Sequence, residues 1–155
     1  RIFQTQSPEA EDYAVNLGLA FQLTNILRDL KSDAEHNRIY LPLEDLQRFG
    51  YSERALLHQQ SSPALADLVK FECERARSYY QTAQDILHTL PPADQKCLVV
   101  AEIMRGVYSR ILKQLEDQHY QVFGPRVRIP PMQRLAIAGK VWARSYFAYR
   151  VAPSV

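Results

Sequence analysis

Four polar side chains in the first third of the sequence recur at helical spacing: Gln22, Asn25, Asp29 and Asp33. On a helix, at about 100° per residue, they form one narrow line, which we refer to as the polar stripe. The carboxylates of Asp29 and Asp33 are one turn apart and can lie within about 5–6 Å of each other. Two like charges held that close require a cation, and carboxylate and amide oxygens favour Mg²⁺ over zinc. The spacing therefore predicts a magnesium site at Asp29 and Asp33.

The polar stripe adjoins a broad apolar arc of the same expected helix, made of Leu19, Leu23, Ile26, Leu27 and Leu30. Polar residues this close to a core-facing arc indicate a surface that faces a cavity. Protein-bound Mg²⁺ commonly shares a substrate phosphate, and Arg28, Lys31 and Arg38 could neutralise a diphosphate there. The spacing alone is also typical of a solvated helix end whose acids form surface ion pairs.

Prolines at the expected helix boundaries, together with only 5 glycines, are typical of an all-α chain. Ser7-Pro8-Glu9 predicts an N-cap and a helix that runs to about Asp33. The remaining elements are expected in chain order: a loop with a short helix over 37–49, a helix from Ser62-Pro63 to Pro91-Pro92, a helix over about 100–118, a loop through Gly124-Pro125, and a last helix from Pro130-Pro131.

Length and composition predict one folded domain or a piece of one. The chain has 155 residues, of which 46% are hydrophobic and 23% charged, so a disordered polymer is excluded. A formal net charge of +2 without runs of like charge argues against a nucleic-acid partner. No stretch approaches the ~20 apolar residues of a membrane span. Cys73 and Cys97 lack zinc or disulfide spacing and are expected to be buried thiols, which favours a cytoplasmic location, with or without membrane association.

Residues 17–29, with Asp33 and the segment 38–42 after them, closely resemble the second aspartate-rich signature of the squalene and phytoene synthase family. The likeness extends from about Ile2 through the last helix and includes residues 105–108 with Ile111 and Leu112. It implies the all-α isoprenoid synthase fold, a helical bundle around a central cavity. It also implies Mg²⁺-dependent, head-to-head condensation of two allylic isoprenoid diphosphates.

The resemblance leaves the product open among squalene, presqualene diphosphate and phytoene. Farnesyl diphosphate, for squalene or hopanoid synthesis, is slightly preferred over geranylgeranyl diphosphate, for carotenoid synthesis. NADPH would be needed only if the product is squalene. The second interpretation is a non-catalytic helical assembly or interaction module of the same fold.

The resemblance also implies a role for each matching residue. Asp29 and Asp33 match Mg²⁺-binding aspartates, and the other expected site residues are polar or diphosphate-contacting ones: Gln22, Asn25, Arg28, Arg38, Tyr40 in the segment that closes over the site, the cavity tyrosine Tyr108, and Arg126. From the residues alone, Tyr108 could equally be a core tyrosine and Arg126 a surface arginine.

Three departures from the family pattern shape the domain prediction. Ser32 stands where a glutamate is common, and Asn37 replaces a usual glycine, although Asn tolerates a left-handed backbone. No first aspartate-rich motif occurs, so residues 1–155 are expected to be the C-terminal portion of a single domain, inactive alone and prone to self-association. The loop with Arg126 and Arg128 could also contact lipid headgroups at a membrane surface.

Overall fold

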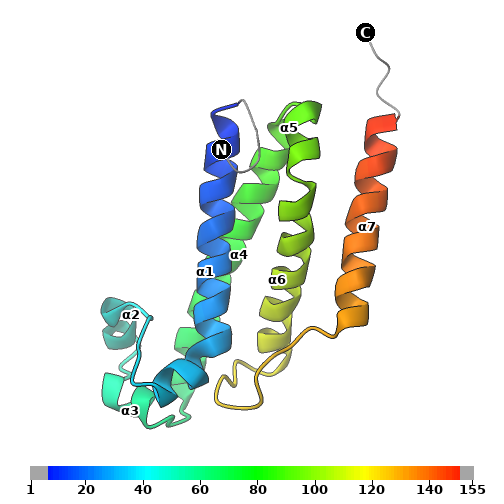
Figure 1. The fold of residues 1–155 in the computed structure, drawn as a ribbon. Coiled ribbons are helices and arrows are strands. Elements are labelled where there is room, and N and C mark those ends of the chain that lie inside the picture. Colours follow the sequence, from blue (N-terminus) through cyan, green and yellow to red (C-terminus); the bar gives the residue numbers. More distant parts are fainter. Residues whose placement is uncertain (1–6, 151–155) are drawn as a thin grey trace.

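In the computed structural model of the chain, the described residues form an all-α bundle, which confirms the predicted fold class (Figure 1). The structure describes residues 7–150, and the side chains of residues 7–146. The start of the family likeness near Ile2 therefore lies outside the described residues. The helices of the described part are α1 (Glu9–Glu35), α2 (Leu43–Arg48), α3 (Glu53–Leu57), α4 (Pro63–Thr89), α5 (Pro92–Cys97), α6 (Val99–Asp117) and α7 (Pro131–Arg150).

The four long helices α1, α4, α6 and α7 lie side by side, and α7 is at the edge of the bundle, next to α6 (Figure 1). The short helices α2 and α3 lie at the end of the bundle where α1 ends and α4 begins. The short helices α3 and α5 were not predicted from the sequence. None of the helices in the described range is long and apolar enough to cross a membrane.

The predicted cap at Ser62 is confirmed, and the one at Ser7 is wrong. Ser62 has an extended backbone, and its Oγ accepts from the Leu65 amide at 3.2 Å. At the start of α1, Pro8 already has helical dihedrals, and the Ala10 amide donates to the Ser7 backbone carbonyl instead. The Ser7 hydroxyl therefore has no amide to cap, and its Oγ is buried without a hydrogen-bond partner.

Helix α1 packs most extensively against α4, and the face it uses differs from the predicted apolar arc. Leu19 is 39% exposed, so its assignment to the buried arc was wrong. Leu27 and Leu30 of the predicted arc are buried, and the buried face also includes residues outside that arc: Ala10, Tyr13, Leu17, Ala20, Thr24 and Ala34. Small side chains at this contact let the two backbones approach closely, which rotates the core face away from Leu19.

A polar network joins α1 to α6. The Tyr13 hydroxyl donates to Glu102 Oε1 at 2.8 Å, and Arg105 donates to both oxygens of Glu102. Burial, reinforced by Glu102, raises the pKa of Tyr13 well above its usual range, so the phenol keeps its proton. Arg105 also donates to Gln84 of α4 at 3.2 Å, and the network therefore ties three long helices together.

Helix α7 attaches to the bundle through α6, at a position where only glycine fits. A Cβ atom added at Gly106 of α6 would lie 2.6 Å from the Cγ2 of Ile137 on α7.

The two cysteines differ in exposure. Cys97 at the end of α5 is exposed, whereas Cys73 is buried as expected. The prediction of a buried Cys97 was wrong because α5 presents this residue to solvent.

We expect Gly106→Ala to lower the free energy of unfolding by about 1 kcal/mol, because overpacking against the β-branched Ile137 outweighs the gain in helix propensity. The matched control is Gly139→Ala on α7, which has open space around it and should gain up to about 1 kcal/mol. Urea denaturation of both variants measures the difference. A Gly106→Ala protein as stable as the control would show that the contact between α6 and α7 adapts freely.

Candidate functional site

The polar stripe of α1 lines one pocket of about 490 Å³, which we refer to as the aspartate pocket. All of the lining residues except Tyr40 come from α1: Gly18, Phe21, Gln22, Asn25, Ile26, Asp29, Asp33 and Tyr40. The structure therefore brings together the four stripe residues and the tyrosine of the segment that follows them. Within the described part of the chain, one helix and one loop residue form the whole lining, so the chain supplies a single wall.

Asp29 is held by two arginines that are far apart in the sequence. Arg28, its neighbour on α1, donates from Nε to Oδ1 at 3.0 Å and from Nη2 to Oδ2 at 2.6 Å. Arg126, in the loop before α7, donates from Nε to Oδ1 at 2.9 Å, and its Nη2 lies 2.6 Å from the same oxygen. Partial burial raises the pKa of Asp29, but the two arginines outweigh it and hold this pKa below its usual value. Asp29 is therefore ionised at neutral pH.

The two arginines also line a second pocket, of about 260 Å³, beside the loop before α7. Lys31 and Glu35 of α1 line it as well, so three cations and one acid surround this second pocket. Arg28 is partly buried, and the hydrogen bond to Asp29 raises its pKa despite that burial. The basic cluster expected from the sequence thus exists, although Arg126 replaces Arg38 in it.

Tyr108 reaches the site through its neighbours and does not line the aspartate pocket. Its ring lies 4.6 Å from that of Phe21, centroid to centroid, and Phe21 lines the pocket. The Tyr108 hydroxyl also contributes to the raised pKa of Arg28, after the larger effect of Asp29. Tyr108 is thus a half-buried ring that packs against the core, as the core interpretation expected. It also contacts Phe21 and acts on Arg28, so it supports two residues of the site.

A left-handed turn brings Tyr40 to the pocket. Asn37 has φ 54°, which confirms that asparagine takes the conformation expected of the usual glycine. The Arg38 amide donates to the Asp33 carbonyl at 2.9 Å and the Asn37 amide to the Ala34 carbonyl at 3.0 Å, the two bonds of a Schellman motif. The backbone of Asp33 thus anchors the turn whose next residues carry Tyr40 over the pocket.

Arg38 itself is not brought to the pocket. Its side chain is exposed and makes no ion pair or hydrogen bond within residues 7–146. Its assignment as a substrate-binding residue stays a prediction.

The oxygens of the stripe fit a hard divalent cation. Asn25 Oδ1 is buried without a hydrogen-bond partner, which is costly unless a ligand uses that acceptor. With the carboxylates of Asp29 and Asp33 it forms an all-oxygen donor set of the kind that Mg²⁺ binds together with water and phosphate. No group of three or more His, Cys, Asp or Glu side chains that could hold a metal occurs in the described part of the chain.

Three lining residues were not singled out from the sequence: Gly18, Phe21 and Ile26. Their spacing could have predicted them, because each lies three or four positions from Gln22, Asn25 or Asp29 and therefore shares the face of the polar stripe. Phe21 and Ile26 make the pocket wall partly apolar next to the carboxylates. The exposed Gly18 leaves space at its end, because a Cβ there would meet nothing within 4 Å.

Comparison with known proteins gives consistent results. The family model for squalene/phytoene synthase matches residues 1–133. The 15-cis-phytoene synthase of Synechocystis sp. is 41% identical over 135 residues, covering 87% of this chain and 39% of the relative. The phytoene synthase of Mycobacterium tuberculosis is 32% identical over 149 residues, covering 93% of this chain and 48% of the relative. The chain thus spans less than half the length of either relative.

Solved structures show the same fold. A dehydrosqualene synthase crystallised with a ligand superposes with a TM-score of 0.70 and 27% identity, covering 85% of this chain and 46% of that one. A squalene synthase from Alicyclobacillus acidocaldarius superposes with a TM-score of 0.67 over 76% of this chain and 44% of that one. At 22% identity, the second likeness shows the fold alone.

We expect Arg126→Gln to raise the pKa of Asp29, because one of the two arginines that lower it is lost. A lowered pKa stabilises the folded state above the pKa of the unfolded chain, and that stability is lost as the pH falls through the folded-state value. The variant should therefore lose about 0.2–1 kcal/mol at pH 7, the range for a half-exposed pair, and match the wild type in strong acid. Carboxyl ¹³C titration reports the pKa of Asp29.

Arg128→Gln is the matched control, since Arg128 is an exposed arginine of the same loop with no ion pair in the described region. An unchanged Asp29 pKa in Arg126→Gln, or an equal shift in the control, would contradict the pairing.

Proposed function

Because the chain belongs to the squalene/phytoene synthase family, we propose that it supplies one wall of an active site that condenses two allylic isoprenoid diphosphates head to head. The product class we propose is phytoene, because the curated relatives named above are phytoene synthases. This favours geranylgeranyl diphosphate over the farnesyl diphosphate preferred from the sequence. A nicotinamide cofactor would then have no part in the reaction.

The observation that carries the proposal is the ionised Asp29 between two guanidinium groups on the wall of the aspartate pocket. A purely structural helix has no need to hold two carboxylates and a buried unpaired amide oxygen at one pocket, with three cations lining a second pocket. The non-catalytic alternative would leave these groups without a role. Their combination supports a site for Mg²⁺ and a diphosphate.

The residues of the chain have separable roles in this proposal. Asp29, Asp33 and Asn25 would hold Mg²⁺, and the bound ion supplies positive charge that stabilises a departing diphosphate. Arg28 and Arg126 lie against Asp29 and can donate to phosphate oxygens bound there. Their charge is fixed, because guanidinium groups do not lose their proton at neutral pH.

The remaining lining residues would shape and cover the pocket. Phe21 and Ile26 provide apolar surface that excludes water from an allylic carbocation, which water would otherwise quench. The phenol of Tyr40, at the mouth, can donate a hydrogen bond to the diphosphate and close the site. Gln22, exposed on the same wall, is a further donor to phosphate oxygens.

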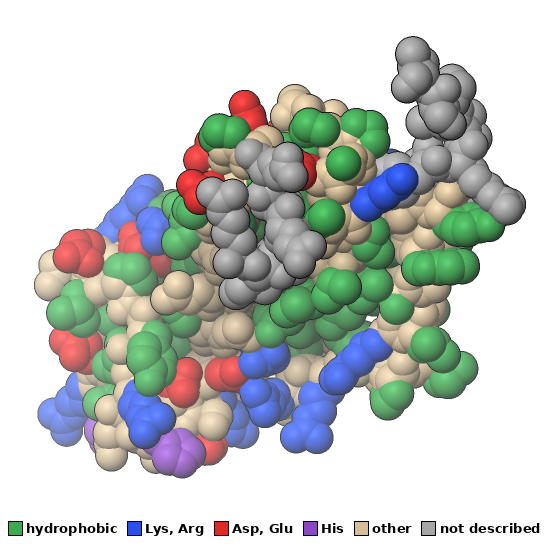
Figure 2. Space-filling view, turned by 45° about the horizontal axis from the view of Figure 1, so that its top comes forward, with side chains coloured by type: hydrophobic (Ala, Val, Ile, Leu, Met, Phe, Trp, Pro, Cys, Tyr) green, Lys and Arg blue, Asp and Glu red, His purple; other side chains and the backbone are tan. Residues whose placement is uncertain are grey.

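Exposed apolar side chains favour a partner for the bundle. Figure 2 shows hydrophobic side chains gathered on the face that leads from the middle of the molecule to α7. Large exposed hydrophobics occur on α1, α6 and α7: Val15, Leu19, Val100, Met104, Met132, Leu135, Trp142 and Tyr146. Surface of this kind is normally covered. We propose that the remainder of a longer domain covers it and that the chain alone self-associates.

Membrane contact through the loop before α7 receives less support. Of the two arginines on which it rests, Arg126 is paired with Asp29. Arg128 is exposed and stays available to a lipid headgroup. One free cation binds a charged surface weakly, so peripheral membrane contact stays a prediction.

We expect Asp33→Asn to weaken the binding of inorganic diphosphate in the presence of Mg²⁺, because the donor set loses a charge at the aspartate pocket. Asp29→Asn should have the same direction of effect. Calorimetric titration with and without Mg²⁺ measures both. Asp12→Asn, an exposed acid in the first turn of the same helix, is the control and should bind as the wild type does. Equal binding by Asp33→Asn and the control would remove Asp33 from the metal site.

We expect residues 1–155 alone to release no diphosphate from geranylgeranyl or farnesyl diphosphate. A longer form with an upstream aspartate-rich helix should do so when Mg²⁺ is present. The reason is that α1 and Tyr40 form one wall, which cannot surround the leaving group or exclude water. Diphosphate release with product identification tests both, and Asp29→Asn in the longer form should slow it. Head-to-head product from the isolated chain would overturn this expectation.

A further inference from the structure

The short helix α2 directly follows the segment that carries Tyr40, and its attachment to the bundle rests on side chains. It has six residues, and it is not among the helix pairs whose backbones pack extensively together. Leu46 inserts into the core, and the Phe49 ring that follows lies 5.4 Å from that of Phe71 on α4. Arg48 of α2 stacks over the same Phe71 ring at 4.4 Å.

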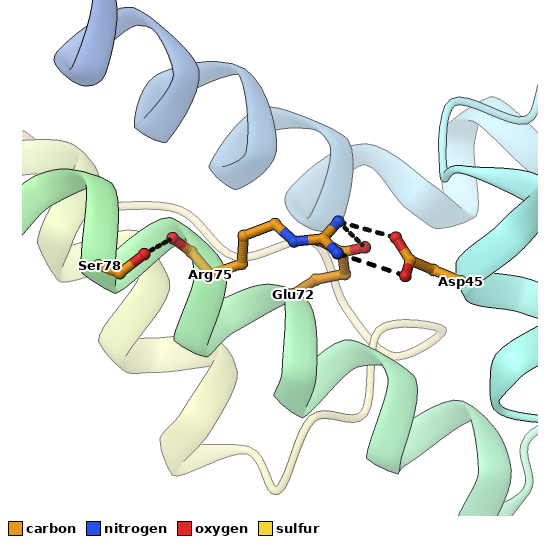
Figure 3. A network of polar contacts seen from close by, with 4 residues as sticks. All are labelled: Asp45, Glu72, Arg75 and Ser78. Atoms are coloured by element: carbon orange, nitrogen blue, oxygen red, sulfur yellow. Dashed lines mark hydrogen bonds and ion pairs between the residues drawn. The ribbon is translucent and has the colours of Figure 1, made fainter.

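An ionic cluster of two buried acids and one partly exposed arginine completes this attachment (Figure 3). Arg75 of α4 donates to both carboxylate oxygens of Asp45 on α2, at 2.7 and 3.3 Å. The same guanidinium donates to both oxygens of Glu72, one turn earlier on α4, at 3.2 and 3.3 Å. Glu72 is fully buried, and Asp45 is 7% exposed. We refer to Asp45, Glu72 and Arg75 as the clasp.

The clasp places two acids against one guanidinium, and Arg48 is a further positive charge that acts on Asp45. Burial raises the pKa of Glu72 to about 7, and the proximity of Asp45 adds to that effect against the opposing charge of Arg75. Hydrogen bonding to Arg75 lowers the pKa of Asp45, and Arg48 acts in the same direction. Of the two acids of the clasp, Glu72 is therefore the one that binds a proton more readily.

Stability alone does not explain such a cluster, because apolar residues of similar volume often stabilise a buried position as well or better. What a bidentate pair adds is a defined geometry between two elements. Here those elements are α4, which packs on α1, and α2, which immediately follows the pocket segment.

We propose that Asp45, Glu72 and Arg75 are positioning residues for the aspartate pocket: they hold α2 on α4 and so determine where the segment 36–42 places Tyr40. This inference rests on the proposed function. Asp33 fixes the near end of the segment through the Schellman motif, and the clasp fixes the far end. Leu41 is buried between the two ends, so Tyr40 has little freedom that is independent of α2.

The clasp also makes this placement depend on pH. When Glu72 ionises, two carboxylates share one guanidinium in a buried position, and the attachment of α2 weakens. Because the folded-state pKa is raised from 4.5 to about 7, the clasp loses stability as the pH rises across that interval, and Glu72 is ionised in the folded state above it. Tyr40 should therefore be held more firmly at pH 6 than at pH 8.

Hydrogen exchange on the longest expressible form of the protein tests the clasp without any ligand. Protection factors of the segment 36–49, corrected for intrinsic exchange, should fall several-fold from pH 6 to pH 8 in the wild type. Glu72→Gln keeps a neutral hydrogen-bonding group in the same volume and should abolish this fall. Arg75→Lys loses the bidentate geometry and should lower protection at both pH values. Arg77→Lys is the matched control, because Arg77 is on the same helix and pairs with Glu116 near the surface.

Binding of inorganic diphosphate with Mg²⁺ then separates this inference from the proposed function. If the wild type binds diphosphate, Arg75→Lys binds it several-fold more weakly and Arg77→Lys binds it as the wild type does, the proposed function and this inference are both supported. If the wild type does not bind, the proposed function is overturned, and the exchange data still decide whether the clasp holds the segment. The inference is overturned if Glu72→Gln keeps the wild-type pH dependence, or if Arg75→Lys changes neither protection nor binding.

Discussion

The packing of α1 against α4 is the contact on which the rest of the structure depends, because it sets the rotation of α1 about its own axis. Ala20 on α1 and Ala76 and Ala83 on α4 are completely buried, which allows the close approach. In the same contact, Thr24 bonds the Ala20 carbonyl at 2.7 Å and lies 2.9 Å from the Tyr80 hydroxyl. A buried polar pair tolerates little rotation, since either group would lose its partner at a cost of about 1–3 kcal/mol. With Thr24 turned toward α4, the polar stripe faces away from the core.

The direction of the stripe explains how charged residues coexist with a closely packed helix. Asp29 lies on the flank of α1 where Arg28 and Arg126 can reach it, and the flank is only partly buried, so desolvation does not neutralise the carboxylate. Phe21 stands between the core and the pocket, and its ring contacts Tyr80 on one side and Tyr108 on the other. The polar stripe therefore lies on a helix that packs against both α4 and α6, whereas Tyr40 lies on the segment between α1 and α2.

Two polar networks that involve α4 show how this bundle combines rigidity with adjustable contacts. Tyr13, Glu102 and Arg105 join α1 to α6 through hydrogen bonds and an ion pair, and burial keeps the proton on the Tyr13 phenol. The clasp instead contains a carboxyl group that changes its charge near pH 7. A titrating group is thus found at the attachment of the small helix next to the pocket, where local opening costs least because few apolar contacts must be broken.

Local sequence patterns were enough to predict the four long helices and the face of α1 that carries the site. Helical periodicity placed Gln22, Asn25, Asp29 and Asp33 on one line, Ser62 marked the start of α4, and Asn37 supplied the left-handed residue at the end of α1. These features follow from dihedral preferences and spacings within a few residues. Only the tertiary structure decided that Arg126 pairs with Asp29, that Leu19 is exposed, that Arg38 stays outside the pocket and that Asp45 meets Arg75. Such contacts join residues 30 or 97 positions apart, and their partners are chosen by how the helices pack, which local patterns do not encode.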